Sequence, residues 1–272
     1  MTTVAAALAA ARARLPASEA RLLLGHILDK PSSWLIAHED EVLDEDALLN
    51  FASLASRRAG GEPVAYLVGR REFFGRDFAV SPAVLIPRPE TELLVELAIA
   101  TLGVGSTAKI LDLGTGSGCI AVTLALELPT AQVSAVDSSL AALAMAQQNA
   151  QRHGARLCLL QSDWLAGLAA ERFDLIVTNP PYVAAADPHL AAGDLRHEPP
   201  EALASGIDGL DAIRRIVADA PLFLAPGGRL MLEHGHDQGA AVRDLLVASG
   251  LAGVEQHRDL AGIVRVSGAR QS

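Results

Sequence analysis

The stretch Ile110-Leu111-Asp112-Leu113-Gly114-Thr115-Gly116-Ser117-Gly118 decides the fold of this chain. Its first half is apolar and predicts a buried strand. The glycines that follow allow a tight turn in which the backbone can approach a ligand, and a helical pattern begins directly after them. A strand, a glycine loop and a helix in this order favour a nucleoside-binding unit of an α/β protein.

Strand and helix patterns alternate from Lys109 onward. Short apolar runs between turn residues predict buried strands, and the longer amphipathic segments between them predict helices. The predicted strands span 109–112, 132–136, 156–161, 173–178, 228–233, 253–258 and 262–267, and the predicted helices lie near 118–127, 138–152, 208–220 and 236–249. This alternation predicts an α/β fold with a doubly wound, mostly parallel sheet of seven strands.

The N-terminal part of the chain has a different pattern. Apolar residues recur at helical spacing through residues 1–60, and Asp44 is placed to cap a helix that ends near Ala59. Gly60 and Gly61 interrupt this pattern, and residues 61–82 predict a β-hairpin linker. We therefore expect a small helical domain over 1–60, a linker over 61–82 and the main domain over 83–272.

Composition excludes several classes of protein. The 272 residues carry a formal charge of -10, and Lys occurs only at positions 30 and 109, so we expect no direct binding of nucleic acid. The two cysteines have no partner at metal-ligand spacing, and no apolar run is long enough to span a membrane. We expect a cytoplasmic monomer without a bound metal. His234 and His236 resemble a metal pair, but solvated histidines at a strand end are the favoured interpretation.

The glycine loop is compatible with two nucleoside cofactors. A dinucleotide site requires the spacing Gly-x-Gly-x-x-Gly, whereas this loop has glycines at 114, 116 and 118, which favours S-adenosylmethionine. Asp137 closes the next strand and is placed to bind ribose hydroxyls, although an aspartate there also serves as a helix cap. Asp163 and Trp164 follow the third strand, where a carboxylate and an aromatic face would meet the adenine, unless Trp164 is ordinary core.

The tetrad Asn179-Pro180-Pro181-Tyr182 follows the apolar strand 173–178, at the sheet edge where α/β proteins place their chemistry. Two prolines stiffen this turn and remove two N–H donors, so it offers carbonyl oxygens beside the Asn179 side chain. Acceptors of this kind suit a planar amino group, whose lone pair they would aim at an electrophile. Tyr182 would stack on such a substrate. The alternative is an ordinary proline-rich turn.

Several further stretches point to one family. They are Glu62-Pro63-Val64-Ala65-Tyr66-Leu67, Glu72-Phe73-Phe74-Gly75, Leu85-Ile86-Pro87-Arg88-Pro89-Glu90-Thr91-Glu92, Glu198-Pro199-Pro200-Glu201-Ala202-Leu203 and Asp208-Gly209-Leu210. Together with the glycine loop, Asp137 and the Asn179 tetrad, they make the chain resemble class I S-adenosylmethionine-dependent methyltransferases of planar amino groups. More closely, it resembles the protein-(glutamine-N5) methyltransferases of peptide chain release factors, the HemK/PrmC family.

The resemblance implies a specific reaction. A methyl group would pass from S-adenosylmethionine, leaving S-adenosylhomocysteine, to the glutamine amide of a Gly-Gly-Gln motif in a release factor, and so modulate translation termination. The N-terminal domain would help to hold that protein. Residues implied to contact the cofactor are Gly114, Thr115, Gly116, Ser117, Gly118, Asp137, Trp164 and Asn179, to which Asp163 is added from its position after the third strand. Those implied to hold the glutamine are Asn179, Pro180, Pro181 and Tyr182.

Asn179, Pro180 and Tyr182 would also carry the catalysis. Two other functions remain open at this point. One is an adenine-N6 methyltransferase acting on DNA or RNA, because adenine presents the same two N–H donors, although the acidic composition disfavours it. The other is a partner-binding protein with a relict methyltransferase fold, although its motifs are intact. The roles of Arg88 and Glu90 are left open.

Overall fold

The computed structural model describes residues 1–169 and 171–272 of the chain. These residues form two compact units, Met1–Arg70 and Arg71–Ser272. The division falls inside the range 61–82 predicted as a linker. The assignment of domains and linker to particular residues stays a prediction.

The N-terminal unit is helical, as predicted. Its helices are α1 (Val4–Ala11), α2 (Ala17–Leu28), α3 (Ser32–Ala37), α4 (Glu45–Ala59) and α5 (Val64–Val68). The Asp44 carboxylate accepts the Ala47 N–H at 2.6 Å, which confirms the predicted cap of α4. Leu23, Leu24 and Phe51 belong to one buried cluster inside this unit, so the helices fold around a core of their own.

The stretch predicted as a β-hairpin is only partly extended. Residues 64–68 form the short helix α5, because Pro63 is favourable before its first turn and Gly69 ends it in a left-handed conformation. The hairpin follows as β1 (Arg70–Phe73) and β2 (Arg76–Ala79), with positive φ angles at Phe74 and Gly75 in the turn.

Seven strands among the described residues build the sheet of the second unit. They are β3 (Lys109–Leu113), β4 (Gln132–Asp137), β5 (Cys158–Gln161), β6 (Phe173–Thr178), β7 (Leu224–Glu233), β8 (Ala252–Arg258) and β9 (Val264–Arg270). Their order is β5-β4-β3-β6-β7-β9-β8, and β9 alone among them runs opposite to the other strands. The chain order reverses between β3 and β6, the switch point where such sheets bind ligands. The predicted doubly wound, mostly parallel sheet is confirmed.

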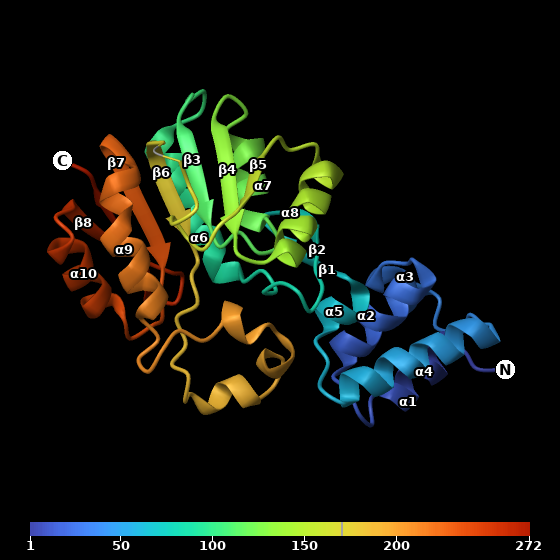
Figure 1. Ribbon diagram of the computed structural model, residues 1–272. Coiled ribbons are helices and arrows are strands. Elements are labelled where there is room, and N and C mark those ends of the chain that lie inside the picture. The colour runs from blue at the N-terminus through green and yellow to red at the C-terminus, as the bar shows by residue number, and fades with distance from the viewer. Residues whose placement is uncertain (170) are drawn as a thin grey trace. The chain divides into compact units, whose positions relative to one another are not determined.

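Helices cover both faces of this sheet (Figure 1). They are α6 (Glu92–Leu102), α7 (Cys119–Glu127), α8 (Leu140–His153), α9 (Asp211–Phe223) and α10 (Gly239–Ala248). Alternate residues of each strand point to opposite faces. Ile110 therefore lies in the cluster that contains α6 and α7, whereas Leu111 lies in the cluster that contains α9 and α10.

One long connection lies beyond the carboxyl edge of the strands. It joins β6 to α9 and contains the single turns η2 (Pro188–Ala191), η3 (Leu195–His197) and η4 (Pro200–Ala202), while η1 (Pro89–Thr91) precedes α6. Figure 1 shows this connection in yellow and orange below the arrowheads of the strands. Across residues 1–169 and 171–272, every helix is too short or too polar to cross a bilayer.

Candidate active site

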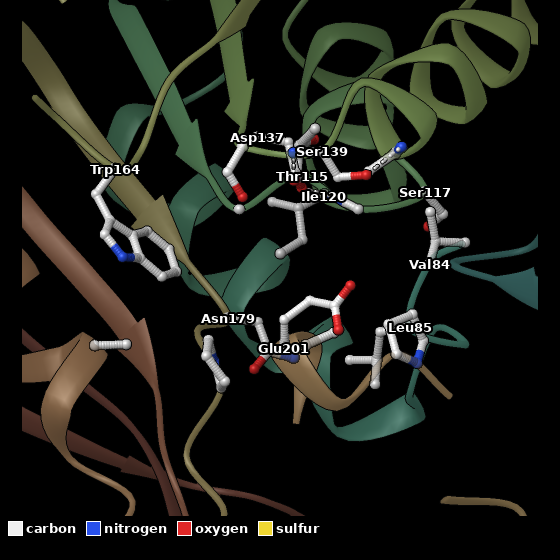
Figure 2. A pocket seen from close by; sticks show the side chains of 18 of the residues that line it. Val84, Leu85, Thr115, Ser117, Ile120, Asp137, Ser139, Trp164, Asn179 and Glu201 are labelled. Atoms are coloured by element: carbon white, nitrogen blue, oxygen red, sulfur yellow. Dashed lines mark hydrogen bonds between the residues drawn. The ribbon is translucent and has the colours of Figure 1, made fainter. Parts of the chain in front are cut away.

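A cavity of about 410 Å³ opens at the carboxyl edge of the sheet, within the second unit. This volume falls in the range of small-molecule sites. The described residues that line it are Ala83, Val84, Leu85, Pro87, Arg88, Thr91, Gly114, Thr115, Gly116, Ser117, Cys119, Ile120, Asp137, Ser138, Ser139, Ala142, Ser162, Asp163, Trp164, Asn179, Pro181, Pro199, Glu201, Ala202, Ala204, Ser205, Asp211, Ala212 and Arg215. Figure 2 shows Asp137 and Trp164 on one side of the cavity and Asn179 and Glu201 on the other.

The glycine loop is fixed to the neighbouring strand. The N–H groups of Gly114 and Thr115 both donate to the carbonyl of Val136, at 2.9 Å each. Gly114, Gly116 and Gly118 all have positive φ angles, which side chains other than glycine rarely adopt. The loop therefore keeps a conformation that glycine favours at these three positions, and Gly114, Thr115, Gly116 and Ser117 line the cavity.

Gly118 does not line the cavity. A Cβ atom at this position would lie 3.0 Å from the Cα and Cβ atoms of Ala146 on α8. The third glycine of the motif therefore lets the start of α7 pack closely against α8, and its predicted contact with a cofactor remains a prediction.

Thr115 directs its hydroxyl into the protein. It donates to the Asp112 carboxylate at 2.7 Å, and Asp112 is fully buried at the end of β3. Burial raises the pKa of Asp112 to about 7, against the opposing effect of the Thr115 hydrogen bond. The hydrogen bond between Asp112 and Thr115 thus holds the glycine loop to the end of β3.

Asp137 holds a central position in the site. Its carboxylate accepts the N–H of Gly116 and the N–H of Ser139, each at 2.9 Å. These bonds orient the side chain at the cavity wall and leave lone pairs for further donors. The Asp137 carboxylate can therefore accept the predicted hydrogen bonds from ribose hydroxyls. It also accepts the Ser139 N–H at the start of α8.

The residues after β5 differ in exposure. Trp164 is half-buried, has a φ of 54° and lies against Gly114, because a Cβ there would meet its ring at 3.1 Å. Its ring faces the cavity (Figure 2). Asp163 also lines the cavity but is exposed and forms an ion pair with Arg215 at 2.8 Å. An adenine amino group would have to share that carboxylate with the guanidinium group.

The tetrad divides into lining and supporting residues. Asn179 and Pro181 line the cavity, whereas Pro180 is buried and its ring does not contribute to the lining. The Tyr182 hydroxyl donates to the Glu233 carboxylate at 3.2 Å, and its ring packs against the α9 side of the core. Burial raises the pKa of Tyr182, with Glu233 adding to the effect. The predicted stacking of Tyr182 on a substrate remains a prediction.

Three further residues around this site are absent from the predicted set. Thr91 accepts a hydrogen bond from Asn179 Nδ2 at 3.0 Å, and Glu198 accepts the N–H of Ile86 at 3.0 Å and pairs with Arg88. Glu233, at the end of β7, is 1% exposed. Thr91 and Glu198 lie in stretches that carried the family resemblance, so the sequence did contain a signal that could have identified them. Glu233 offered no such signal, because an acidic residue at the end of a strand has many ordinary roles.

The prediction of solvated histidines is wrong for His234. This side chain is fully buried, and its ring nitrogens lie 2.9 Å from the Gly235 carbonyl and 2.9 Å from the Ser267 hydroxyl. It follows the buried end of β7 and is enclosed by β9, whereas His236 is exposed. In the part of the chain that the structure describes, no three His, Cys, Asp or Glu side chains gather as a metal site.

The charges at the cavity suit a ligand that carries positive charge. Asp137, Asp163, Glu201 and Asp211 lie in its lining. The lining cations, Arg88 and Arg215, are already paired with Glu198 and Asp163. The bare backbone of the glycine loop, the Asp137 carboxylate and the Trp164 ring provide a nucleoside with hydrogen-bond partners and a stacking face. These residues fit S-adenosylmethionine, whose sulfonium is cationic.

Comparisons with known proteins agree with this geometry. Residues 89–206 match the model of the methyltransferase small domain, and residues 1–69 match that of the PrmC N-terminal domain. The crystal structure of a methyltransferase from Pyrococcus furiosus superimposes with a TM-score of 0.57 and 18% identity, covering 81% of this chain and 99% of that chain. The strand order, glycine loop and cavity therefore define a class I methyltransferase.

Relatives in sequence are more specific. The release factor glutamine methyltransferase of Bordetella pertussis is 52% identical over 255 residues, 93% of this chain and 94% of that protein. The release factor glutamine methyltransferase of Xylella fastidiosa strain Temecula1 is also 52% identical, over 271 residues, 99% of this chain and 98% of that protein. This chain belongs to the family of release factor glutamine methyltransferases. These matches confirm the predicted family and the predicted enzyme class, an S-adenosylmethionine-dependent methyltransferase.

Proposed function

We propose that this protein methylates the side-chain amide nitrogen of a glutamine in a peptide chain release factor, within a Gly-Gly-Gln motif. The observation that carries the proposal is the arrangement of Asn179 at the cavity. Its Nδ2 atom donates to Thr91, so its Oδ1 atom is left to accept an N–H from a substrate. Membership of the family, with high identity over nearly the whole chain, supports the same reaction.

Asn179 Oδ1 and the Pro180 carbonyl each accept one N–H of the glutamine amide in this proposal. Held at both hydrogens, the amide nitrogen keeps its lone pair aimed at the methyl donor, and the two acceptors stabilise positive charge that develops on nitrogen. S-adenosylmethionine supplies an electrophilic sulfonium methyl group when bound, and its product is S-adenosylhomocysteine. The N–C bond forms as the C–S bond breaks, and the nitrogen then loses one proton.

The cofactor would occupy the other side of the cavity. Gly114 to Ser117 offer backbone atoms, Asp137 accepts hydrogen bonds from the ribose, and Trp164 provides a face for the adenine. Asp163 would contribute a hydrogen-bond acceptor beside the adenine while paired with Arg215.

We further propose that the N-terminal helical unit helps to hold the release factor, and that the protein acts as a cytoplasmic monomer without direct binding of nucleic acid.

Mass spectrometry of a release factor incubated with the protein and S-adenosylmethionine tests the proposal. We expect one added methyl group on the Gly-Gly-Gln glutamine. In Asn179→Ala, turnover should fall by about a hundredfold or more with cofactor binding largely intact, because the lost acceptor positions the amide. Gln151→Ala, which removes an exposed amide on α8, serves as the matched control. Methylation of an adenine-containing DNA with the release factor untouched would contradict the proposal.

A further inference from the structure

One buried carboxylate joins two segments of the second unit that are far apart in sequence. Residues 80–88 lead from β2 to η1 outside any helix or strand, and Glu198 lies between the turns η3 and η4. The Glu198 side chain is fully buried. Its Oε2 atom accepts the N–H of Ile86 at 3.0 Å, and its Oε1 atom pairs with Arg88, 110 residues away in sequence. Both carboxylate oxygens therefore bind the segment before η1.

These two segments form one wall of the cavity. Leu85 and Arg88 line it from the first segment, and Glu201 lines it from the second, whereas Glu198 does not belong to the lining. Figure 2 shows Leu85, Glu201 and Asn179 on the same side of the cavity. Glu198 thus ties together the wall on which the proposed acceptor of the substrate amide lies.

A series of contacts leads from Glu198 to Asn179. The Arg88 carbonyl accepts the N–H of Thr91 at 3.1 Å, which closes the single turn η1. Thr91 is 2% exposed, and its Oγ1 atom accepts a hydrogen bond from Asn179 Nδ2 at 3.0 Å. The contacts therefore run from Glu198 through Arg88 and Thr91 to the Asn179 carboxamide.

Different parts of the protein hold the main chain and the side chain of Asn179. The residue directly follows β6, which is paired with β3 and β7, so the sheet fixes its backbone. Its carboxamide instead donates to Thr91, at the end of the segment that Glu198 holds. A shift of that segment would turn the carboxamide without moving the strand. A displacement of about 1 Å at a reacting group can lower a rate about a hundredfold.

The chemistry of Glu198 also suits a positioning role. A buried ion pair contributes little net stability, because the loss of hydration offsets the attraction, and its best-attested use is to select one arrangement of the chain. Pro82, Pro87 and Pro89 have no N–H group, so the segment before η1 has few donors with which to fix itself. Glu198 takes one of the remaining donors, the Ile86 N–H.

We propose that Glu198 is a positioning residue for methyl transfer. It holds residues 86–91 so that Thr91 directs the Asn179 carboxamide with its oxygen facing the substrate amide. This inference rests on the proposed function, because it assigns Asn179 Oδ1 the role of acceptor. It adds a residue that acts on the reaction from outside the cavity, and it places Arg88, whose role the sequence left open, in the same network.

Steady-state methylation of a release factor by Glu198 variants tests the inference. Glu198→Gln keeps the size of the side chain but loses the charge that pairs with Arg88, so kcat should fall about tenfold or more, with the Kd for S-adenosylmethionine within about twofold of wild type. Glu198→Asp keeps the charge and the fold but is one methylene too short to reach both partners, so kcat should fall about threefold or more. The matched control is Glu127→Gln, which breaks the ion pair with Arg76 at the end of α7 and should leave kcat unchanged.

A double variant separates positioning from a merely structural role. Thr91→Val removes the acceptor for Asn179 and should lower kcat about tenfold or more, and Thr91→Ser should restore most of the rate. Because Glu198 acts through Thr91, adding Glu198→Gln to Thr91→Val should lower kcat by no more than about twofold further. Full multiplication of the two effects would overturn the inference, and so would wild-type kcat in both Glu198 variants.

A second measurement does not depend on catalysis. The side-chain NH2 signals of Asn179, assigned by their loss in Asn179→Ala, should shift in 15N-labelled Glu198→Asp and Thr91→Val and stay in place in Glu127→Gln. Unshifted signals in Glu198→Asp would contradict the inference. If the wild-type protein binds S-adenosylmethionine and its variants show these shifts, but release factors are left unmodified, the proposed function fails and the positioning network stands.

Discussion

The indole ring of Trp164 lies directly against the backbone of Gly114. A Cβ atom at Gly114 would stand 3.1 Å from Trp164 Cζ3, closer than ordinary side-chain contacts. The first glycine of the loop therefore does more than permit a φ of +70°. It leaves room for the aromatic ring that would face the adenine.

Gly114→Ala should accordingly weaken binding of S-adenosylmethionine by about tenfold or more, because the added methyl group displaces the Trp164 ring from its stacking position. Isothermal titration calorimetry measures the affinity. Gly154→Ala is a matched control, since Gly154 has the same φ of +70° but no atom within 4 Å of its would-be Cβ. Equal affinities for the two variants would contradict the steric explanation.

Asp137→Ala should also weaken cofactor binding, by about tenfold or more, because it removes the acceptor that holds Gly116 together with the proposed ribose contact. Calorimetric titration with S-adenosylmethionine again provides the measurement. The control is Asp174→Ala, which removes a carboxylate that accepts a backbone N–H from Lys109 at the start of β3. An unchanged affinity in Asp137→Ala would rule out Asp137 as a cofactor residue.

Glu198→Ala should lower the free energy of unfolding by about 2 kcal/mol, measured by urea denaturation. Its side chain is fully buried, and its loss leaves the buried N–H of Ile86 without an acceptor and Arg88 without its partner. Glu171→Ala breaks the exposed pair with Lys109 and should cost less than about 0.5 kcal/mol. Similar losses for both variants would show that Glu198 does not anchor the segment before α9.

Stability should rise as the pH falls from about 8 to about 6. Folding raises the pKa values of Asp112 and Glu233 from 3.8 and 4.5 to about 7. Between pH 8 and pH 6 these two groups therefore take up protons in the folded protein while they stay ionised in the unfolded chain. The free energy of unfolding should gain about 1 kcal/mol per group over this interval, seen as a higher Tm.

The gain in Tm should shrink in Glu233→Gln and persist in Glu96→Gln, which alters an exposed carboxyl on α6. A full gain in the Glu233 variant would mean that other groups cause the pH dependence.

The sequence alone determined the local units of this protein. Short apolar runs, amphipathic helical segments and turn residues predicted the doubly wound, mostly parallel sheet, since such patterns report directly which residues are buried. It predicted wrongly where several local signals competed. Residues 64–68 are helical between Pro63 and Gly69 rather than extended, and His234 is buried although its neighbour His236 is exposed.

Tertiary structure decided what surrounds the site. Thr91 is 88 residues from Asn179, and Glu233 reaches the tetrad only because β6 and β7 are parallel neighbours in register. Gly118 serves packing against α8, and the Tyr182 hydroxyl is held by a carboxylate. Sequence motifs mark groups that act through their own chemistry, whereas the burial and hydrogen-bond direction that tune them depend on partners brought close only by the fold.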